Sequence, residues 1–237
     1  MIQFNAVRYL QFPIILLLLL ITASACSPTN KMVGLWQIEK VSVGTEEMTP
    51  IAKWTLLNKN YTQTSGNGWL QHTIGDWSYD KKQQEIRLNN TNGMEDEYGG
   101  FTVKFAAEKM IWQRQEEGQE VKVTLAKIDQ IPESPANHLF GVWQLTTDEE
   151  SNENEAYSHL MIRWDQIIVM RKPDGIRAYG MYKPHGHKPE VQVIHYEDPL
   201  RSSIWIYNLE GSNLLTLNYE EDGESIQLEY KRVRTFP

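Results

Sequence analysis

The sequence has a single cysteine, Cys26, among its 237 residues. One thiol cannot form an intrachain disulfide, and it has no second soft ligand with which to hold a metal. Positive charge is also scarce, because 31 Asp and Glu residues outnumber 23 Lys and Arg residues, which gives a formal net charge of −8 at pH 7. An acidic chain is a poor partner for phosphate backbones, so we expect no binding of nucleic acid.

The sequence motifs of catalysis are missing as well. The chain has no G-x-S-x-G nucleophile elbow, no glycine loop for phosphate and no dinucleotide fingerprint. We therefore expect a protein that is not an enzyme and has no cofactor. An enzyme would need a polar cluster at the mouth of a domain, and the segment His195-Tyr196-Glu197 is the first place to look for one.

A metal site is considered at His185 and His187. Two imidazoles one residue apart on an extended segment point the same way and suit zinc. Pro184 and Pro189 flank the pair, however, and this is typical of a solvent-exposed loop. We expect no metal there.

The N-terminal segment has the three parts of a secretory signal. A short polar start carries Arg8, an apolar run extends from Phe12 to Ile21, and Ala23, Ser24 and Ala25 precede Cys26. The apolar run is shorter than the roughly 20 residues that a membrane-spanning helix needs.

This arrangement resembles a bacterial lipoprotein signal, in which the cysteine becomes the first mature residue and carries acyl chains. The resemblance implies a signal peptide at residues 1–25, lipid attachment at Cys26 and a tether at residues 26–31. Two or three acyl chains anchor a protein firmly, at about 0.8 kcal/mol for each buried methylene. No acidic pair follows Cys26, so we expect a cell-envelope protein that faces the periplasm. The alternative is an uncleaved anchor with an unmodified cysteine.

The remainder of the chain repeats itself. Gly34-Leu35-Trp36 matches Gly141-Val142-Trp143, and later segments match at a constant offset of 105 residues. The matched pairs include Gly75 with Gly180, Glu85 with Glu190, Gly118 with Gly223, Val121 with Ile226, and Lys127 with Arg232. The repeat predicts two homologous domains, residues 32–129 and 138–237, joined by a proline-containing polar linker at residues 130–137.

Both repeats have the two-residue period of β-strands. Val121, Val123 and Leu125 alternate with polar residues, and Gly118 completes a turn typical of a hairpin. No long amphipathic helix is evident. Seven or eight short antiparallel strands protect their edges best by closing on themselves. We predict an all-β fold with two tandem antiparallel up-and-down β-barrels after the N-terminal signal segment.

A GxW motif on the first strand and a basic residue on the last strand resemble the lipocalins, in particular the short lipocalin-like domains of envelope lipoproteins. In that family the tryptophan plugs the closed end of the barrel beneath the basic side chain. The resemblance implies that Trp36 with Lys127, and Trp143 with Arg232, form structural plugs. A cation over an indole contributes about 0.5–2 kcal/mol. The resemblance also implies a small apolar ligand.

The aromatic side chains are candidates for lining a cavity, because an eight-stranded barrel either is filled by side chains or holds one small ligand. We predict ligand-binding positions at Trp54, Trp77, Trp112, Tyr182 and Tyr219. The alternative is a pair of filled barrels that act as a structural module or bind an envelope protein. The expected partners are therefore the membrane, through acyl chains on Cys26, and either a small apolar ligand or another envelope protein.

Overall fold

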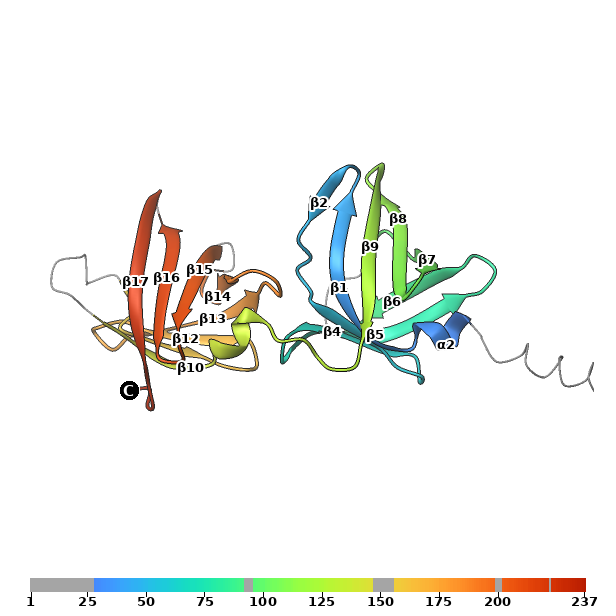
Figure 1. Ribbon diagram of the computed structural model, residues 1–237. Coiled ribbons are helices and arrows are strands. Elements are labelled where there is room, and N and C mark those ends of the chain that lie inside the picture. Colours follow the sequence, from blue (N-terminus) through green and yellow to red (C-terminus); the bar gives the residue numbers. More distant parts are fainter. Residues whose placement is uncertain (1–27, 92–95, 147–155, 199–201, 222) are drawn as a thin grey trace, which may run out of the picture.

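The computed structural model describes residues 28–91, 96–146, 156–198, 202–221 and 223–237. Figure 1 shows two β-barrels that follow one another along the chain. The prediction of an all-β protein with two tandem antiparallel barrels is confirmed, and each closed ring has eight strands. Cys26 and the expected signal peptide lie outside the described residues. Among the described helices, none is both long and apolar enough to cross a membrane.

The first barrel is a ring in which β9 pairs back onto β1, and the short strand β2 extends from β1 outside the ring. A short helix, α2 (Pro28–Met32), precedes it, so most of the segment expected as a tether is helical. The strands are β1 (Gly34–Val43), β2 (Glu46–Met48), β3 (Trp54–Leu57), β4 (Thr62–Asn67), β5 (Leu70–Asp80), β6 (Glu85–Asn90), β7 (Phe101–Ala106), β8 (Lys109–Glu116) and β9 (Gln119–Ile128).

The second barrel closes through pairing of β17 with β10. A 3₁₀ helix, η1 (Pro135–His138), precedes it, and the side chain of Ser134 caps this helix by accepting a hydrogen bond from the backbone N–H of Ala136. The strands are β10 (Gly141–Leu145), β11 (His159–Ile162), β12 (Ile167–Arg171), β13 (Arg177–Pro184), β14 (Glu190–His195), β15 (Ser202–Glu210), β16 (Leu214–Glu221) and β17 (Glu224–Val233).

The two barrels repeat each other in backbone detail. Tyr61 and Gln166, which are 105 residues apart, both adopt a left-handed conformation, with φ of 66° and 65°. Each carbonyl accepts a hydrogen bond from an equivalent strand residue: Trp77 N–H donates to Tyr61 over 2.7 Å, and Tyr182 N–H donates to Gln166 over 2.9 Å. A positive φ is uncommon for these residue types, so its presence at both positions shows that the duplication preserved the turn.

Each barrel has a core of its own, built from the inward-facing residues of the alternating strands. The first core contains Met32, Trp36, Leu57, Trp77, Ile86, Phe101, Val103, Met110, Trp112, Val121 and Leu125. The second contains Ala136, Leu139, Trp143, Leu160, Ile162, Ile168, Met170, Tyr182, Val191, Val193, Trp205, Tyr207, Leu215, Leu217 and Tyr230, together with Leu70 from the first barrel.

The hairpin between β4 and β5 joins the two barrels. Its residue Asn67 is fully buried, accepts a hydrogen bond from the N–H of Lys53 over 2.7 Å and donates one to the carbonyl of Pro184 over 2.7 Å. Nearby, the N–H of Gly186 donates to the carbonyl of Ile51 over 2.9 Å. A buried polar group that loses its partners is costly, so these bonds fix how one barrel sits against the other.

The tip of the same hairpin packs against η1 and the start of the second barrel. The N–H of Trp69 donates to the side-chain oxygen of Asn137 over 3.0 Å, and its ring stacks on Phe140 with centroids 6.5 Å apart. Gly68 has a φ of +55°, and a Cβ atom there would lie 2.0 Å from the same Asn137 oxygen. Only glycine fits this close approach.

Candidate functional site at the mouth of the second barrel

One end of each barrel is closed by a tryptophan that lies beside a helix. The indole nitrogen of Trp36 donates to the carbonyl of Met32 in α2 over 2.7 Å. The indole nitrogen of Trp143 donates to the carbonyl of Leu139, the residue that ends η1, over 2.8 Å. Both tryptophans are almost completely buried. The two helices therefore hold equivalent plugs, each bonded to a residue four positions earlier.

A cation from the last strand covers each plug. The ammonium nitrogen of Lys127 lies 5.4 Å from the ring centroid of Trp36 and donates to the carbonyl of Val33 over 3.2 Å. The guanidinium carbon of Arg232 lies 4.1 Å from the ring centroid of Trp143. Arg232 also donates to the carbonyls of Phe140, His138 and Ser212. The planar guanidinium can bond several carbonyls at once, which an ammonium group cannot match in geometry.

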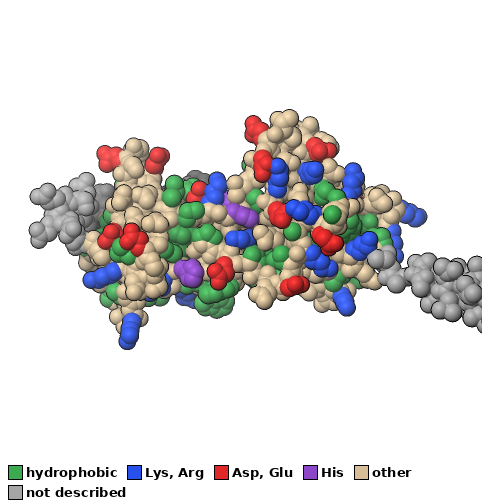
Figure 2. Space-filling view, in the orientation of Figure 1, with side chains coloured by type: hydrophobic (Ala, Val, Ile, Leu, Met, Phe, Trp, Pro, Cys, Tyr) green, Lys and Arg blue, Asp and Glu red, His purple; other side chains and the backbone are tan. Residues whose placement is uncertain are grey.

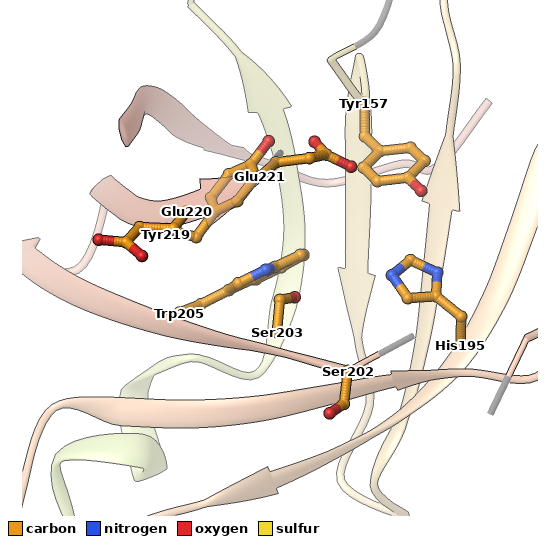
Figure 3. A pocket seen from close by; sticks show the side chains of 8 residues that line it. All are labelled: Tyr157, His195, Ser202, Ser203, Trp205, Tyr219, Glu220 and Glu221. Carbon is orange, nitrogen blue, oxygen red and sulfur yellow. The ribbon is translucent and has the colours of Figure 1, made fainter. Parts of the chain in front are cut away.

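The opposite end of the second barrel contains a pocket of about 430 Å³ (Figure 3). The residues that line it come from the end of β14, the start of β15, the end of β16 and the segment before β11. They are Tyr157, His195, Ser202, Ser203, Trp205, Tyr219, Glu220 and Glu221.

Aromatic rings form one part of the pocket wall. The rings of Trp205 and Tyr219 have centroids 5.6 Å apart and planes inclined by 33°. Trp205 is only 4% exposed, whereas Tyr219 is half-buried. Figure 3 shows Tyr157 and His195 on the other side of the space in front of these rings. A planar or apolar group in the pocket would contact the rings.

The rest of the wall is polar and carries negative charge. Ser202 and Ser203 contribute hydroxyl groups, and Glu220 and Glu221 contribute carboxylates. Of the described residues that line the pocket, none is Lys or Arg. The pocket therefore combines ring faces with hydrogen-bonding groups and a negative field.

A buried tyrosine supports this wall from behind. Tyr230 is 1% exposed, and its hydroxyl donates to the carbonyl of Tyr157 over 3.1 Å. Burial raises the pKa of Tyr230 well above its usual range, with smaller contributions from Tyr219 and Tyr157. The hydroxyl therefore keeps its proton and remains a donor that positions the backbone of Tyr157.

Of the predicted ligand-binding positions, Tyr219 lines the pocket, whereas Trp77, Trp112 and Tyr182 belong to the barrel cores. Trp54 is also buried, but it belongs to neither core and packs against the β4–β5 hairpin at Gly66. The indole nitrogen of Trp54 donates to the carbonyl of Gly68 over 2.9 Å, and that of Trp77 donates to the carbonyl of Asn58 over 3.0 Å.

The other two interior positions are also fully packed. The hydroxyl of Tyr182 donates to the carbonyl of Arg163. Trp112 packs against Phe101, with centroids 5.7 Å apart. A ligand-binding role for these four buried residues stays a prediction.

Trp205 is one of the aromatic residues that the sequence offers for lining a cavity, although it is not among the five positions predicted above. Its signal is the pattern Ser203-x-Trp205 at the start of β15, which places a small polar residue beside a large ring on the inner face. His195, named above only as a place to look for an enzyme, also lines this pocket.

His185 and His187 have ring centroids 6.4 Å apart. The ring nitrogen Nδ1 of His185 accepts hydrogen bonds from the backbone N–H groups of His187 and Lys188, over 3.1 and 3.2 Å. In the part of the chain that the structure describes, no three His, Cys, Asp or Glu side chains gather as a metal would require.

The corresponding end of the first barrel is occupied by Arg114. The guanidinium carbon of this residue lies 4.0 Å from the ring centroid of Phe101 and 5.4 Å from that of Tyr98. Arg114 forms ion pairs with Asp96 and with Glu116, the latter over 2.5 Å. Its side chain is only 11% exposed, so this end of the first barrel contains a cation that belongs to the chain itself.

Comparison with known proteins gives little that bears on function. No family model matches the chain, and no curated protein matches it. Among solved structures, the chain is similar to a protein of unknown function from the DUF3598 family of Nostoc punctiforme PCC 73102, with 14% sequence identity and a TM-score of 0.23. The similarity covers 86% of this chain and 97% of that one. A TM-score of this size is too low to transfer a function.

Proposed function

We propose that this chain is a lipid-anchored lipoprotein of the cell envelope and that its second, lipocalin-like barrel binds a small ligand. The observation that supports binding is the pocket of about 430 Å³, whose lining includes the aromatic side chains of Tyr157, Trp205 and Tyr219. Small-molecule sites combine aromatic side chains with polar groups that orient the ligand, and this pocket contains both. The ligand presents an apolar or planar face to the two rings. The protein is a binding module and performs no catalysis.

The anchoring part of the proposal is supported by the sequence around Cys26. The barrels face the periplasm, and acyl chains on Cys26 hold them at the membrane. The experiment is membrane fractionation of the full chain and of Cys26→Ser, combined with mass measurement of the N-terminal peptide. We expect an acylated peptide beginning at Cys26 in the wild type. An unmodified cysteine in that peptide would contradict the anchoring.

The first barrel has a supporting role in this proposal. Its interior is filled by tryptophan and aliphatic side chains, and its β4–β5 hairpin holds the second barrel through Asn67 and Leu70. The alternative considered above, a structural module, thus applies to one barrel, and ligand binding applies to the other.

Binding is tested on the purified full chain in lipid nanodiscs, with empty nanodiscs as the reference and indole as a small planar probe. Saturation-transfer NMR measures contact between indole and the protein. We expect transfer in the wild type and a large loss in Trp205→Ala, because this change removes the ring at the base of the pocket. Trp164→Ala is the matched control, since Trp164 is 77% exposed and does not line the pocket.

Tyr219→Ala provides a second test if Trp205→Ala does not fold, because Tyr219 is only half-buried. Thermal unfolding of each variant shows which of them keep the barrel intact. Equal transfer in the wild type and in a folded pocket variant, or no transfer in the wild type, would contradict the proposal.

A further inference from the structure

The helix α2 is held against the closed end of the first barrel (Figure 1). Its last residue, Met32, is fully buried, and the carbonyl of Met32 accepts the indole hydrogen bond of Trp36. The ammonium nitrogen of Lys31 lies 5.9 Å from the ring centroid of Phe105, near the end of β7. These contacts fix Pro28, where α2 begins, at this end of the barrel.

The residue expected to carry lipid is a short distance along the chain from α2. Cys26 precedes Pro28 by two residues, and two residues of extended chain span at most about 7 Å. An acylated Cys26 therefore brings the closed end of the first barrel to the surface of the bilayer. This step rests on the anchoring that is part of the proposed function.

The strand registers place three turns at the same end as α2. The pairing of Gly34 with Leu57, for example, brings the β3–β4 turn beside the start of β1. The three turns are the β3–β4 turn (residues 58–61), the β5–β6 turn (residues 81–84) and the β7–β8 turn (residues 107–108). Together with α2 and the end of β9, they form the surface that would face the bilayer.

Exposed lysines gather on this surface, which we call the basic end. They are Lys31, Lys59, Lys81, Lys82 and Lys127. A sixth lysine, Lys109, is paired with Glu39. The carboxylates at the basic end are those of Asp80, Glu108 and Asp129. Figure 2 shows more Lys and Arg than Asp and Glu side chains over this end of the first barrel, although the whole chain has a formal net charge of −8.

The second barrel shows that the fold does not need four of these lysines. At the offset of 105 residues, the positions of Lys59, Lys81 and Lys82 are occupied by Trp164, Gly186 and His187. Lys31, which precedes the residue that accepts the Trp36 hydrogen bond, corresponds in the same way to His138. The cation over the plug is kept in both barrels, as Lys127 and Arg232. The other four lysines therefore have a role outside the closing of a barrel.

We propose that the basic end is a docking surface for the headgroups of anionic phospholipids, and that the first barrel rests on the bilayer through it. A lysine close to an anionic leaflet contributes about 1 kcal/mol of attraction. Two exposed rings lie among these lysines, since Tyr61 is 51% exposed and Phe105 is 37% exposed. Aromatic side chains beside cationic ones suit the headgroup region of a membrane.

The experiment measures how fast the lysines of the acylated full chain are acetylated in nanodiscs. Acetic anhydride is the reagent because it carries no charge, and peptide mass spectrometry at low extents of labelling gives the rate for each lysine. One set of nanodiscs contains phosphatidylcholine alone, and the other also contains phosphatidylglycerol. We expect Lys59 and Lys82 to react about fivefold more slowly in the anionic nanodiscs, because headgroups cover them. Molar salt should remove the difference.

Exposed lysines elsewhere on the molecule are the internal controls. Lys188 and Lys231 belong to the second barrel, and Lys40 lies near the open end of β1. Their rates should be the same in the two kinds of nanodisc. An equal slowing of these lysines would show that the basic end is not the face that docks.

A pair of double variants separates docking from the tether. Lys81→Gln with Lys82→Gln should return the rate of Lys59 in anionic nanodiscs toward its value in phosphatidylcholine. Lys188→Gln with Lys231→Gln removes the same charge from the second barrel and should leave Lys59 protected. All four positions are exposed, so both variants should keep the unfolding temperature of the wild type. Protection of Lys59 that survives the first variant would overturn the docking surface.

The outcomes distinguish this inference from the proposed function, because the same digest contains the N-terminal peptide. An acylated Cys26 with equal lysine rates in both nanodiscs would overturn the docking surface and leave the anchoring intact. An unmodified Cys26 would overturn the anchoring and the docking surface together. Ligand binding by the second barrel is decided separately by the indole experiment.

Discussion

The two barrels of this chain are alike at their closed ends and different at their mouths. Each closed end has a tryptophan, a short helix that accepts its indole hydrogen bond, and a cation from the last strand. One mouth is filled by Arg114 and its partners, and the other is a pocket. The features that a barrel needs in order to fold are kept in both copies, whereas the mouth has changed.

The barrel interiors show how this change was accommodated. In the first barrel Val103 of β7 pairs with Trp112 of the adjacent strand β8. In the second barrel Tyr207 of β15 pairs with Leu217 of β16. The large and small residues have exchanged strands at the same level of the barrel. Volume-conserving exchanges of this kind keep a core packed, and both barrels are filled at this level.

The comparison of closed ends is tested most strongly by removing the plugs. We expect Trp36→Ala and Trp143→Ala each to lower the free energy of unfolding by about 3–5 kcal/mol, from the cavity that truncation leaves. Urea unfolding of the full chain, followed by circular dichroism, measures the loss. Trp164→Ala should change it by less than about 0.5 kcal/mol, because this residue is exposed. If either plug variant lowers the free energy of unfolding no more than Trp164→Ala does, the two closed ends are not equivalent.

The connection between the barrels is tested at Asn67. Asn67→Ala leaves the N–H of Lys53 and the carbonyl of Pro184 without their partners, and we expect a cost of about 2–3 kcal/mol. The variant should also split a single unfolding transition into two, which differential scanning calorimetry records. Asn208→Ala, at an exposed position on β15, is the control. One unsplit transition of unchanged midpoint would show that the hairpin does not couple the barrels.

The cations over the two plugs should differ in strength. Arg232 lies closer to its indole than Lys127 does and bonds three carbonyls instead of one. We expect Arg232→Met to cost about 2 kcal/mol and Lys127→Met about 1 kcal/mol. Urea unfolding of the two variants gives the comparison. A larger loss in Lys127→Met would reverse the ranking.

The smallest effect is a pH dependence at the junction. Burial, followed by the charge of Lys183, lowers the pKa of His72 below its ordinary value of 6.5. Because the unfolded chain binds this proton more readily, the contribution of His72 to stability is complete above pH 6.5 and is lost as the pH falls toward its folded pKa. Unfolding free energies at pH 7.5 and pH 5 should therefore differ less in His72→Gln than in the wild type.

An exposed histidine, His138, gives the matched control for this pH series. His138→Gln should keep the pH dependence of the wild type. An unchanged slope in His72→Gln would show that this residue does not carry the effect.

Local patterns were sufficient to predict the barrels. The two-residue period and the turn glycines act between neighbours in the sequence, and the matched residues at the offset of 105 made the duplication visible. The helices α2 and η1 were missed because they are short and each is tied to its barrel by a tryptophan hydrogen bond. The junction was missed because Asn67 and Pro184 are 117 residues apart.

The place of Trp205 beside Tyr219 could not be predicted from the repeat, for a geometric reason. An offset of 105 residues, applied without a gap, makes Phe101 correspond to Ile206, whose side chain faces outward. The β15–β16 hairpin is one residue longer than its counterpart: Glu210 pairs with Leu214, whereas Ala106 pairs with Lys109. This extra residue in the loop shifts β15 by one position and brings Trp205 to the inner face. The sequence of the loop alone does not reveal the shift.

The placement of Leu70 within the core of the second barrel has a consequence for biosynthesis. A chain that is made from its N-terminus completes the β4–β5 hairpin long before β10 is available. The first barrel has a core built from its own residues, whereas the core of the second barrel includes Leu70 from the first. Folding therefore proceeds from the first barrel to the second. The second barrel produced in isolation would lack the side chain of Leu70 in its core.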